Sequence, residues 1–135
     1  SDECGAPEFF GGGLKLIGLP GNGCKLSGDT VAAAIGRYSG HVPHQVNAAA
    51  LSITQATEAG TIYRTDEVAG LAEIAHGHGL TVHMDGARFG NALARMNVSP
   101  AEATWIGSSI QDSSRVTCAR KLSALSTLEK APSCR

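Results

Sequence analysis

Residues 49–85 read AALSITQATEAGTIYRTDEVAGLAEIAHGHGLTVHMD, and this stretch decides the fold. Its two ends, residues 49–54 and 80–85, are short apolar runs rich in strand-forming side chains, as is typical of buried strands. Residues 65–79 between them carry apolar side chains at helical spacing. These side chains are Val68, Leu71, Ile74 and Ala75. The pattern predicts a strand, a helix and a second strand.

The ends of the predicted helix carry signals of their own. Thr65 is a candidate N-cap, and Asp66 and Glu67 place negative charge in the first turn, where the helix dipole favours it. Gly79 is expected to end the helix, because glycine adopts the left-handed conformation of a terminating residue without strain.

Strand, helix, strand with short connections is a βαβ unit, so we expect parallel strands and a right-handed crossover. The carboxyl ends of both strands then meet at one edge of the sheet, where open α/β sheets bind ligands. Thr54, Gln55 and Asp85 fall at that edge. The sequence therefore predicts an α/β fold with a mostly parallel sheet and flanking helices, and it places Asp85 where ligands bind.

The flanking regions give weaker patterns. Residues 14–20 are expected to form a strand that Pro20 stops, and residues 29–38 a short helix capped by Ser27 or Asp29. Residues 41–46 are a weak strand candidate, and Pro43 would place this strand at a sheet edge or at a bulge.

The chain changes character after Trp105. The remaining segment is rich in Ser, Arg and Lys, shows no evident strand and offers one short helix at about 119–129. It is either packed on the domain or poorly ordered. We therefore divide the chain into a domain at 1–105 and a divergent tail at 106–135.

Composition excludes several classes of function. Lys and Arg number 11 against 12 Asp and Glu, which leaves no electrostatic case for a nucleic-acid partner. No apolar run approaches the ~20 residues of a membrane span. The four cysteines are irregularly spaced and predict free thiols in the cytoplasm. The histidine pairs at 41/44 and 76/78 lack the second half of a zinc site, so no metal is expected.

Asp85 and Arg88 lie three residues apart in the segment HMDGARFG at 83–90. One interpretation is a salt bridge that closes a loop. The other is a clamp, because the small Gly86 and Ala87 leave both charges free to face a common ligand. A carboxylate can keep a cofactor's ring nitrogen protonated, and a guanidinium can fork onto a substrate carboxylate.

Three motifs carry a resemblance to a known family. DECGAPEFF at 2–10, LSITQATEAGTIY at 51–63 and GLTVHMDGARFGNALA at 79–94 occur in this order. They resemble the low-specificity L-threonine aldolases of the aromatic amino acid β-eliminating lyase and threonine aldolase family, and the resemblance runs from about Asp2 to Trp105. These enzymes use pyridoxal 5'-phosphate (PLP). The resemblance implies part of the large PLP-binding domain of an aspartate aminotransferase-like (fold type I) enzyme.

The resemblance also implies roles for particular residues. Asp85 would pair with the pyridine nitrogen of PLP, and Arg88 would hold the carboxylate of the amino-acid substrate. His83 shares a face with Asp85 by strand alternation and either supports the cofactor or is an ordinary core or edge histidine. The loop after the first strand either lines the site or is a plain turn. Its candidate residues are Thr54 and Gln55 for the cofactor and Glu58 for the substrate.

Two parts of the family's cofactor site are missing from the pattern. The loop that holds the PLP phosphate has no counterpart, and the Schiff-base lysine motif is absent from RVTCARKL at 115–122, where Lys121 reads as a surface residue. The chain therefore looks truncated. Its implied activity is cleavage of L-threonine or L-allo-threonine to glycine and acetaldehyde, in a homo-oligomer. The alternatives are an inactive α/β remnant or subunit-pairing fragment, and another PLP-dependent β-eliminating amino acid lyase.

Overall fold

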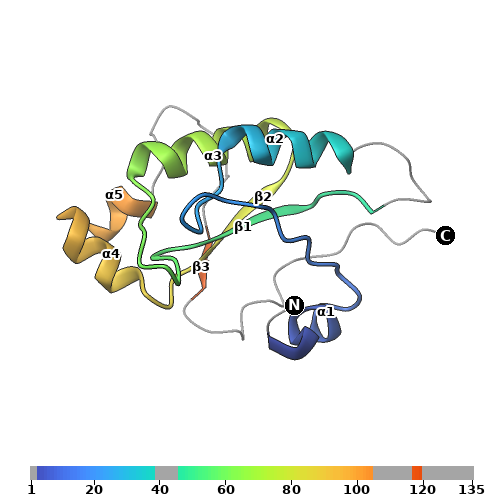
Figure 1. Ribbon diagram of the computed structural model, residues 1–135, viewed down its shortest axis with the longest axis horizontal. Helices are drawn as coiled ribbons and strands as arrows, with labels where there is room; N and C mark the ends of the chain where they lie inside the picture. The colour runs from blue at the N-terminus through green and yellow to red at the C-terminus, as the bar shows by residue number, and fades with distance from the viewer. Residues whose placement is uncertain (1–2, 39–45, 105–116, 120–135) are drawn as a thin grey trace. The chain divides into compact units, whose positions relative to one another are not determined.

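The computed structural model describes residues 3–38, 46–104 and 117–119, which fall into two compact units (Figure 1). The first unit, within residues 1–18, holds the 3-10 helix η1 (Glu3–Gly5) and the short helix α1 (Ala6–Phe10). The second unit, residues 19–119, holds the sheet and the other helices. Its elements are α2 (Gly28–Arg37), β1 (Ala50–Thr54), α3 (Thr65–Gly77), β2 (Thr81–Asp85), α4 (Phe89–Met96), α5 (Pro100–Thr104) and β3 (Thr117–Ala119).

The predicted βαβ unit is confirmed. β1 and β2 pair in parallel, with Ala50 opposite Thr81 and Thr54 opposite Asp85, and α3 connects them. β3 adds a third parallel strand beside β2, so the sheet order is β1-β2-β3. The observed strands begin one residue later than the sequence predicted.

The core lies on one face of this sheet. Figure 1 shows α2 and α3 side by side along that face. Alternate strand side chains point into it, and apolar side chains of both helices meet them. The strand contributors are Leu51, Ile53, Val82 and Met84, and the helix contributors include Val31, Ile35, Val68, Leu71 and Ala75. The intervening strand residues are half-buried or exposed, so the polar side chains of the strands gather on the other face.

The helix ends follow the predicted chemistry with one exception. Ser27 caps α2, since its Oγ accepts a hydrogen bond from the Thr30 N–H. Gly79, at φ 75°, follows α3 as expected. The exception is Thr65, which was predicted as the N-cap of α3: Arg64 takes that place, and its N–H donates to the Glu67 carboxylate at 2.7 Å. Glu67 reaches back across the first turn and satisfies the N–H of the N-cap residue, which is the glutamate half of a capping box.

Two other expectations need correction, and two lie mostly outside the described residues. Residues 14–20 form no strand, because this apolar run finds no neighbouring strand among the described residues to pair with. The segment after Trp105 does contain a strand, β3, where none was evident. Most of residues 41–46 and of the helix expected at 119–129 falls outside the described ranges; Ala119 itself ends β3. The division at Trp105 stays a prediction.

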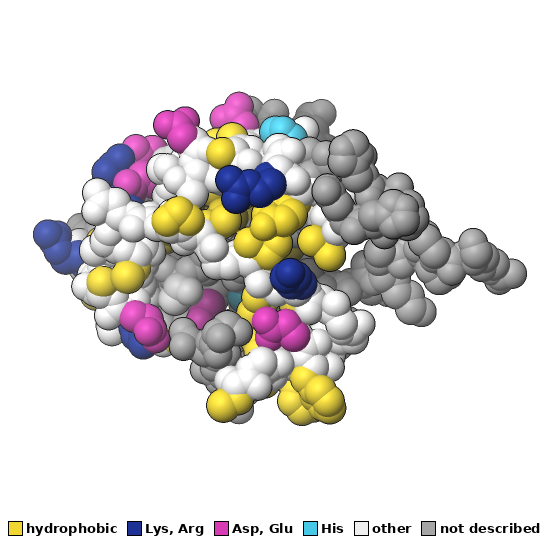
Figure 2. Space-filling view, turned by 45° about the vertical axis from the view of Figure 1, so that its right-hand side comes forward, with side chains coloured by type: hydrophobic (Ala, Val, Ile, Leu, Met, Phe, Trp, Pro, Cys, Tyr) yellow, Lys and Arg dark blue, Asp and Glu magenta, His cyan; other side chains and the backbone are white. Residues whose placement is uncertain are grey.

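The surface has mixed charge. On the face shown in Figure 2, acidic and basic side chains are interspersed with apolar ones. Cys4 and Cys24 are free and exposed, as predicted. Among the described residues, no helix is both long and apolar enough to cross a membrane.

Tyr63 and Lys25 join the loop before α2 to the start of α3. The Tyr63 hydroxyl accepts a hydrogen bond from the Leu26 N–H at 2.7 Å, and burial raises the pKa of Tyr63. Lys25 lies 5.3 Å from the centre of the Tyr63 ring, and its Nζ is 2.6 Å from Glu67 Oε2. Burial raises the pKa of Glu67, but hydrogen bonds from Lys25 and from the Arg64 backbone outweigh it and hold that pKa below its usual value. This ion pair therefore stabilises the loop against α3 only while Glu67 is ionised.

Glu67→Gln tests this link. Because the folded-state pKa of Glu67 lies below its ordinary value of 4.5, the ion pair stabilises the folded state above that pH and stops doing so as the pH falls through the folded-state pKa. We expect the variant to lose about 1 kcal/mol of unfolding free energy near neutral pH, with the deficit shrinking as the pH falls below 4.5. Urea denaturation across this range measures it, with Glu73→Gln on the exposed side of α3 as the control. A deficit that stays the same at all pH values would contradict the assignment.

Candidate active site

The carboxyl ends of β1 and β2 meet, as the sequence predicted. Thr54 and Asp85 are register partners, and the Gln55 N–H donates to the Asp85 carbonyl at 2.9 Å. The parallel pairing therefore continues one residue beyond β1, and it fixes where the chain leaves each strand. α4 begins four residues after Asp85 and lies beside this edge in Figure 1.

Asp85 turns its carboxylate toward the loop that follows it. Its Oδ1 accepts a hydrogen bond from the Ala87 N–H at 3.0 Å, which is a local turn of the kind that aspartate favours. The side chain is half-buried. Within the described residues no other donor meets this carboxylate, so its second oxygen is free to accept a hydrogen bond from a ligand.

Arg88 pairs with a different acid. Its Nη2 donates to Glu58 Oε1 at 3.2 Å, across 30 residues of sequence. The salt bridge between Asp85 and Arg88, one of the two interpretations of this segment, does not form. The two charges of HMDGARFG therefore have separate partners, and both lie at the carboxyl edge of the sheet.

The loop after β1 is built around a buried amide. The Gln55 side chain is fully buried; its Nε2 donates to the Tyr63 carbonyl at 2.7 Å, and its Oε1 accepts from the Tyr63 N–H at 2.9 Å. Thr57 is also buried, and its hydroxyl lies 2.6 Å from that of Thr61. These bonds hold both arms of the loop together, so the segment is an ordered structure from which Glu58 projects.

Gln55 and Thr54 meet different surroundings. The side-chain nitrogen and oxygen of Gln55 both bond to Tyr63, so the structure gives this residue a role in shaping the loop. A direct contact between Gln55 and a cofactor stays a prediction. Thr54 is half-buried at the end of β1. Sequence reasoning missed Tyr63. The feature that could have indicated its structural role is an aromatic residue at the end of the segment TIY, just before the helix.

His83 lies on the face that alternation predicted. It is half-buried, like Asp85 two residues later, while Met84 between them is fully buried. Its Nδ1 lies 2.9 Å from the hydroxyl oxygen of Ser52, its register partner on β1. Ser52 was not a sequence candidate, since only the register of the two strands brings it to His83. The pair fixes the orientation of the imidazole ring on the Asp85 face.

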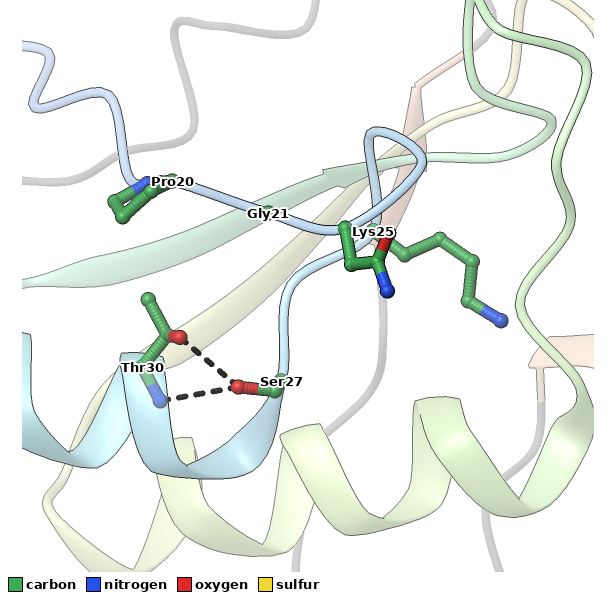
Figure 3. A pocket seen from close by; sticks show the side chains of 6 residues that line it. Pro20, Gly21, Lys25, Ser27 and Thr30 are labelled. Atoms are coloured by element: carbon green, nitrogen blue, oxygen red, sulfur yellow. Dashed lines mark hydrogen bonds between the residues drawn. The ribbon is translucent and has the colours of Figure 1, made fainter.

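The hollow in Figure 3 lies elsewhere, at the start of α2. It has a volume of about 260 Å³. Its lining residues are Pro20, Gly21, Asn22, Lys25, Ser27 and Thr30. It contains none of the predicted site residues, and its lysine is already paired with Glu67. The candidate site is therefore the polar group at the sheet edge.

Comparisons with known proteins agree on one family. The family described as beta-eliminating lyase matches residues 1–124. A low specificity L-threonine aldolase of Pseudomonas sp. (strain NCIMB 10558) is 44% identical over 106 residues, which cover 78% of this chain and 30% of that protein. The enzyme of the same name from Pseudomonas aeruginosa is 43% identical over the same length. This chain thus spans about 30% of the length of these curated relatives.

A solved structure supports the fold. The threonine aldolase of Leishmania major aligns with a TM-score of 0.56 and 29% identity, over 61% of this chain and 23% of that one. The predicted fold, an α/β fragment with a parallel sheet that belongs to an aminotransferase-like domain, is therefore confirmed.

Gln55→Leu tests whether the buried amide holds the loop. The substitution keeps the volume but leaves the N–H and carbonyl of Tyr63 without partners. We expect a loss of about 2–4 kcal/mol in the free energy of unfolding, measured by urea denaturation. Glu58→Gln, three residues along the same loop, is the control and is expected to change stability by less than about 1 kcal/mol, because its ion pair is exposed. Equal effects of the two substitutions would overturn the structural role of Gln55.

Proposed function

Because the chain belongs to the beta-eliminating lyase family, we propose that it is part of a PLP-dependent lyase of the threonine aldolase type. The proposed reaction is cleavage of L-threonine or L-allo-threonine to glycine and acetaldehyde. Two relatives named low specificity L-threonine aldolase support this choice of substrate, since each is more than 40% identical over 106 residues.

The observation that carries the proposal is the position of Asp85. Its carboxylate follows a parallel strand, and one oxygen is held by the Ala87 N–H while the other is free within the described residues. A half-buried carboxylate in this arrangement fits a protonated pyridine nitrogen, because an opposite charge at hydrogen-bond distance favours the protonated ring. When bound, PLP supplies a sink for the electrons released as the Cα–Cβ bond of the substrate breaks.

Arg88 would bind the carboxylate of the amino acid. A guanidinium has five N–H donors in a planar fork, and Arg88 uses one of them on Glu58. This fork can hold the substrate carboxylate in a two-point contact, which would fix the orientation of the substrate relative to the cofactor.

Other residues would support these two contacts. We assign His83, oriented by Ser52, to the face that carries Asp85, and Thr54 and Gln55 to the neighbouring strand end and loop. The covalent lysine and the phosphate loop are not assigned to residues of this chain. By resemblance to the family we also propose a homo-oligomer, and from the free thiols we propose a location in the cytoplasm.

PLP binding by the purified chain tests the function. We expect PLP to raise the melting temperature of the wild type in proportion to ln(1 + [PLP]/Kd). Asp85→Asn should weaken PLP binding by roughly tenfold or more, because a charge-assisted hydrogen bond is lost. Asp29→Asn, an exposed carboxylate in the first turn of α2, is the matched control and should leave the affinity unchanged.

Two outcomes would count against the proposal. A cooperative melt that PLP does not change would favour the alternative of an inactive α/β remnant. Equal PLP affinity in wild type and Asp85→Asn would remove Asp85 from the site. Glycine formation from L-threonine, followed with added PLP, then separates a chain that only binds the cofactor from one that also turns over.

A further inference from the structure

The Arg88 guanidinium is already bound to a carboxylate of its own chain. Its Nη2 donates to Glu58 Oε1 at 3.2 Å, and the two side chains are 43% and 78% exposed. Among the described residues this is the one hydrogen bond that the guanidinium makes. An exposed ion pair with a single contact is weak, since water and salt compete for both charges.

The two partners are held in place by different means. The loop backbone on either side of Glu58 is fixed by the buried Gln55 amide and by the Thr57 hydroxyl, which are both bonded within the loop. Arg88 takes the N-cap position of α4, which directly follows the turn made by Asp85. The backbones of both residues are therefore ordered while the Glu58 side chain stays exposed. Its carboxylate can leave Arg88 without disturbing the loop.

We propose that Glu58 is an internal carboxylate that occupies Arg88 until the carboxylate of an amino-acid ligand displaces it. This inference rests on the proposed function, in which Arg88 binds the substrate carboxylate. Two carboxylates on one guanidinium repel each other, and at about 4 Å in a partly exposed site this repulsion exceeds the strength of an exposed ion pair. Displacement is therefore favoured over joint binding, and Glu58 acts as a positioning residue that keeps Arg88 at the sheet edge.

Competition between Glu58 and the ligand predicts the direction in which the affinity for carboxylates changes when Glu58 loses its charge. If Glu58 competes with the ligand, Glu58→Gln removes the competing charge and ligand carboxylates bind more tightly. If Glu58 instead supported the ligand, the same variant would bind it more weakly. From the strength of an exposed ion pair, we expect Kd to decrease by about two- to fivefold.

The experiment uses the whole chain and two probes, sodium acetate and glycine. Each is titrated at constant ionic strength while the side-chain Nε–Hε signal of Arg88 is followed by ¹⁵N NMR, with Arg88→Lys used to assign that signal. We expect Kd in Glu58→Gln to fall about two- to fivefold below the wild-type value for both probes. Glu58→Asp keeps the carboxylate and should return Kd toward the wild-type value. Glu73→Gln, an exposed carboxylate on α3, removes the same charge elsewhere and should leave Kd unchanged.

The outcomes separate this inference from the proposed function. Equal or weaker probe binding in Glu58→Gln, or no effect of either probe on the Arg88 signal in any variant, overturns the displacement. An equal gain in Glu73→Gln overturns it too, because the effect would then be one of net charge. The response of the melting temperature to PLP depends on Asp85 and is expected to be the same in wild type and Glu58→Gln. Its loss in both would overturn the cofactor site while the Arg88 measurement still stands.

Discussion

The parallel pairing of β1 with β2 is the constraint on which the rest of the structure depends. The register places Thr54 opposite Asp85, and the Gln55 N–H extends the ladder by one bond to the Asp85 carbonyl. Parallel strands need a crossover, and α3 provides it while burying its apolar side against the sheet. Both loops that carry charged candidates therefore leave the sheet at the same edge. The candidate site is a consequence of this topology.

The same pairing divides the strands into two chemical faces. Leu51, Ile53 and Met84 point into the core under α2 and α3, while Ser52, His83 and Asp85 alternate with them. Burial of the apolar face fixes the register, because a slip of one residue would place polar side chains in the core. The His83–Ser52 contact depends on that register, as does the position of the Asp85 carboxylate. Packing on one face thus orients polar groups on the other.

Sequence reasoning succeeded where the signal was local and periodic. The spacing of Val68 and Leu71 predicted α3, and the apolar runs on either side predicted β1 and β2. It failed where the outcome depends on distant partners. The run at 14–20 has strand-forming side chains but pairs with no strand within residues 3–38, 46–104 and 117–119. β3 is only three residues long and pairs with the edge of β2. The amino-acid composition of a segment does not determine which other segment it pairs with.

The same limit explains the Asp85 and Arg88 pair. Their separation of three residues suggested a salt bridge, but proximity in sequence places charges together only if the backbone between them allows it. Here the Ala87 N–H captures Asp85 Oδ1, and Arg88 opens α4 and meets Glu58 from 30 residues away. An Asp85–Arg88 pair would direct the two charges at each other and weaken the attraction of both for a ligand. Because each has its own weak or local partner, the carboxylate keeps an oxygen, and the guanidinium keeps donors, that meet no other group in the described part of the chain. In the proposed function, these two charges would recognise two different ligand groups, a ring nitrogen and a carboxylate, at one edge of the sheet.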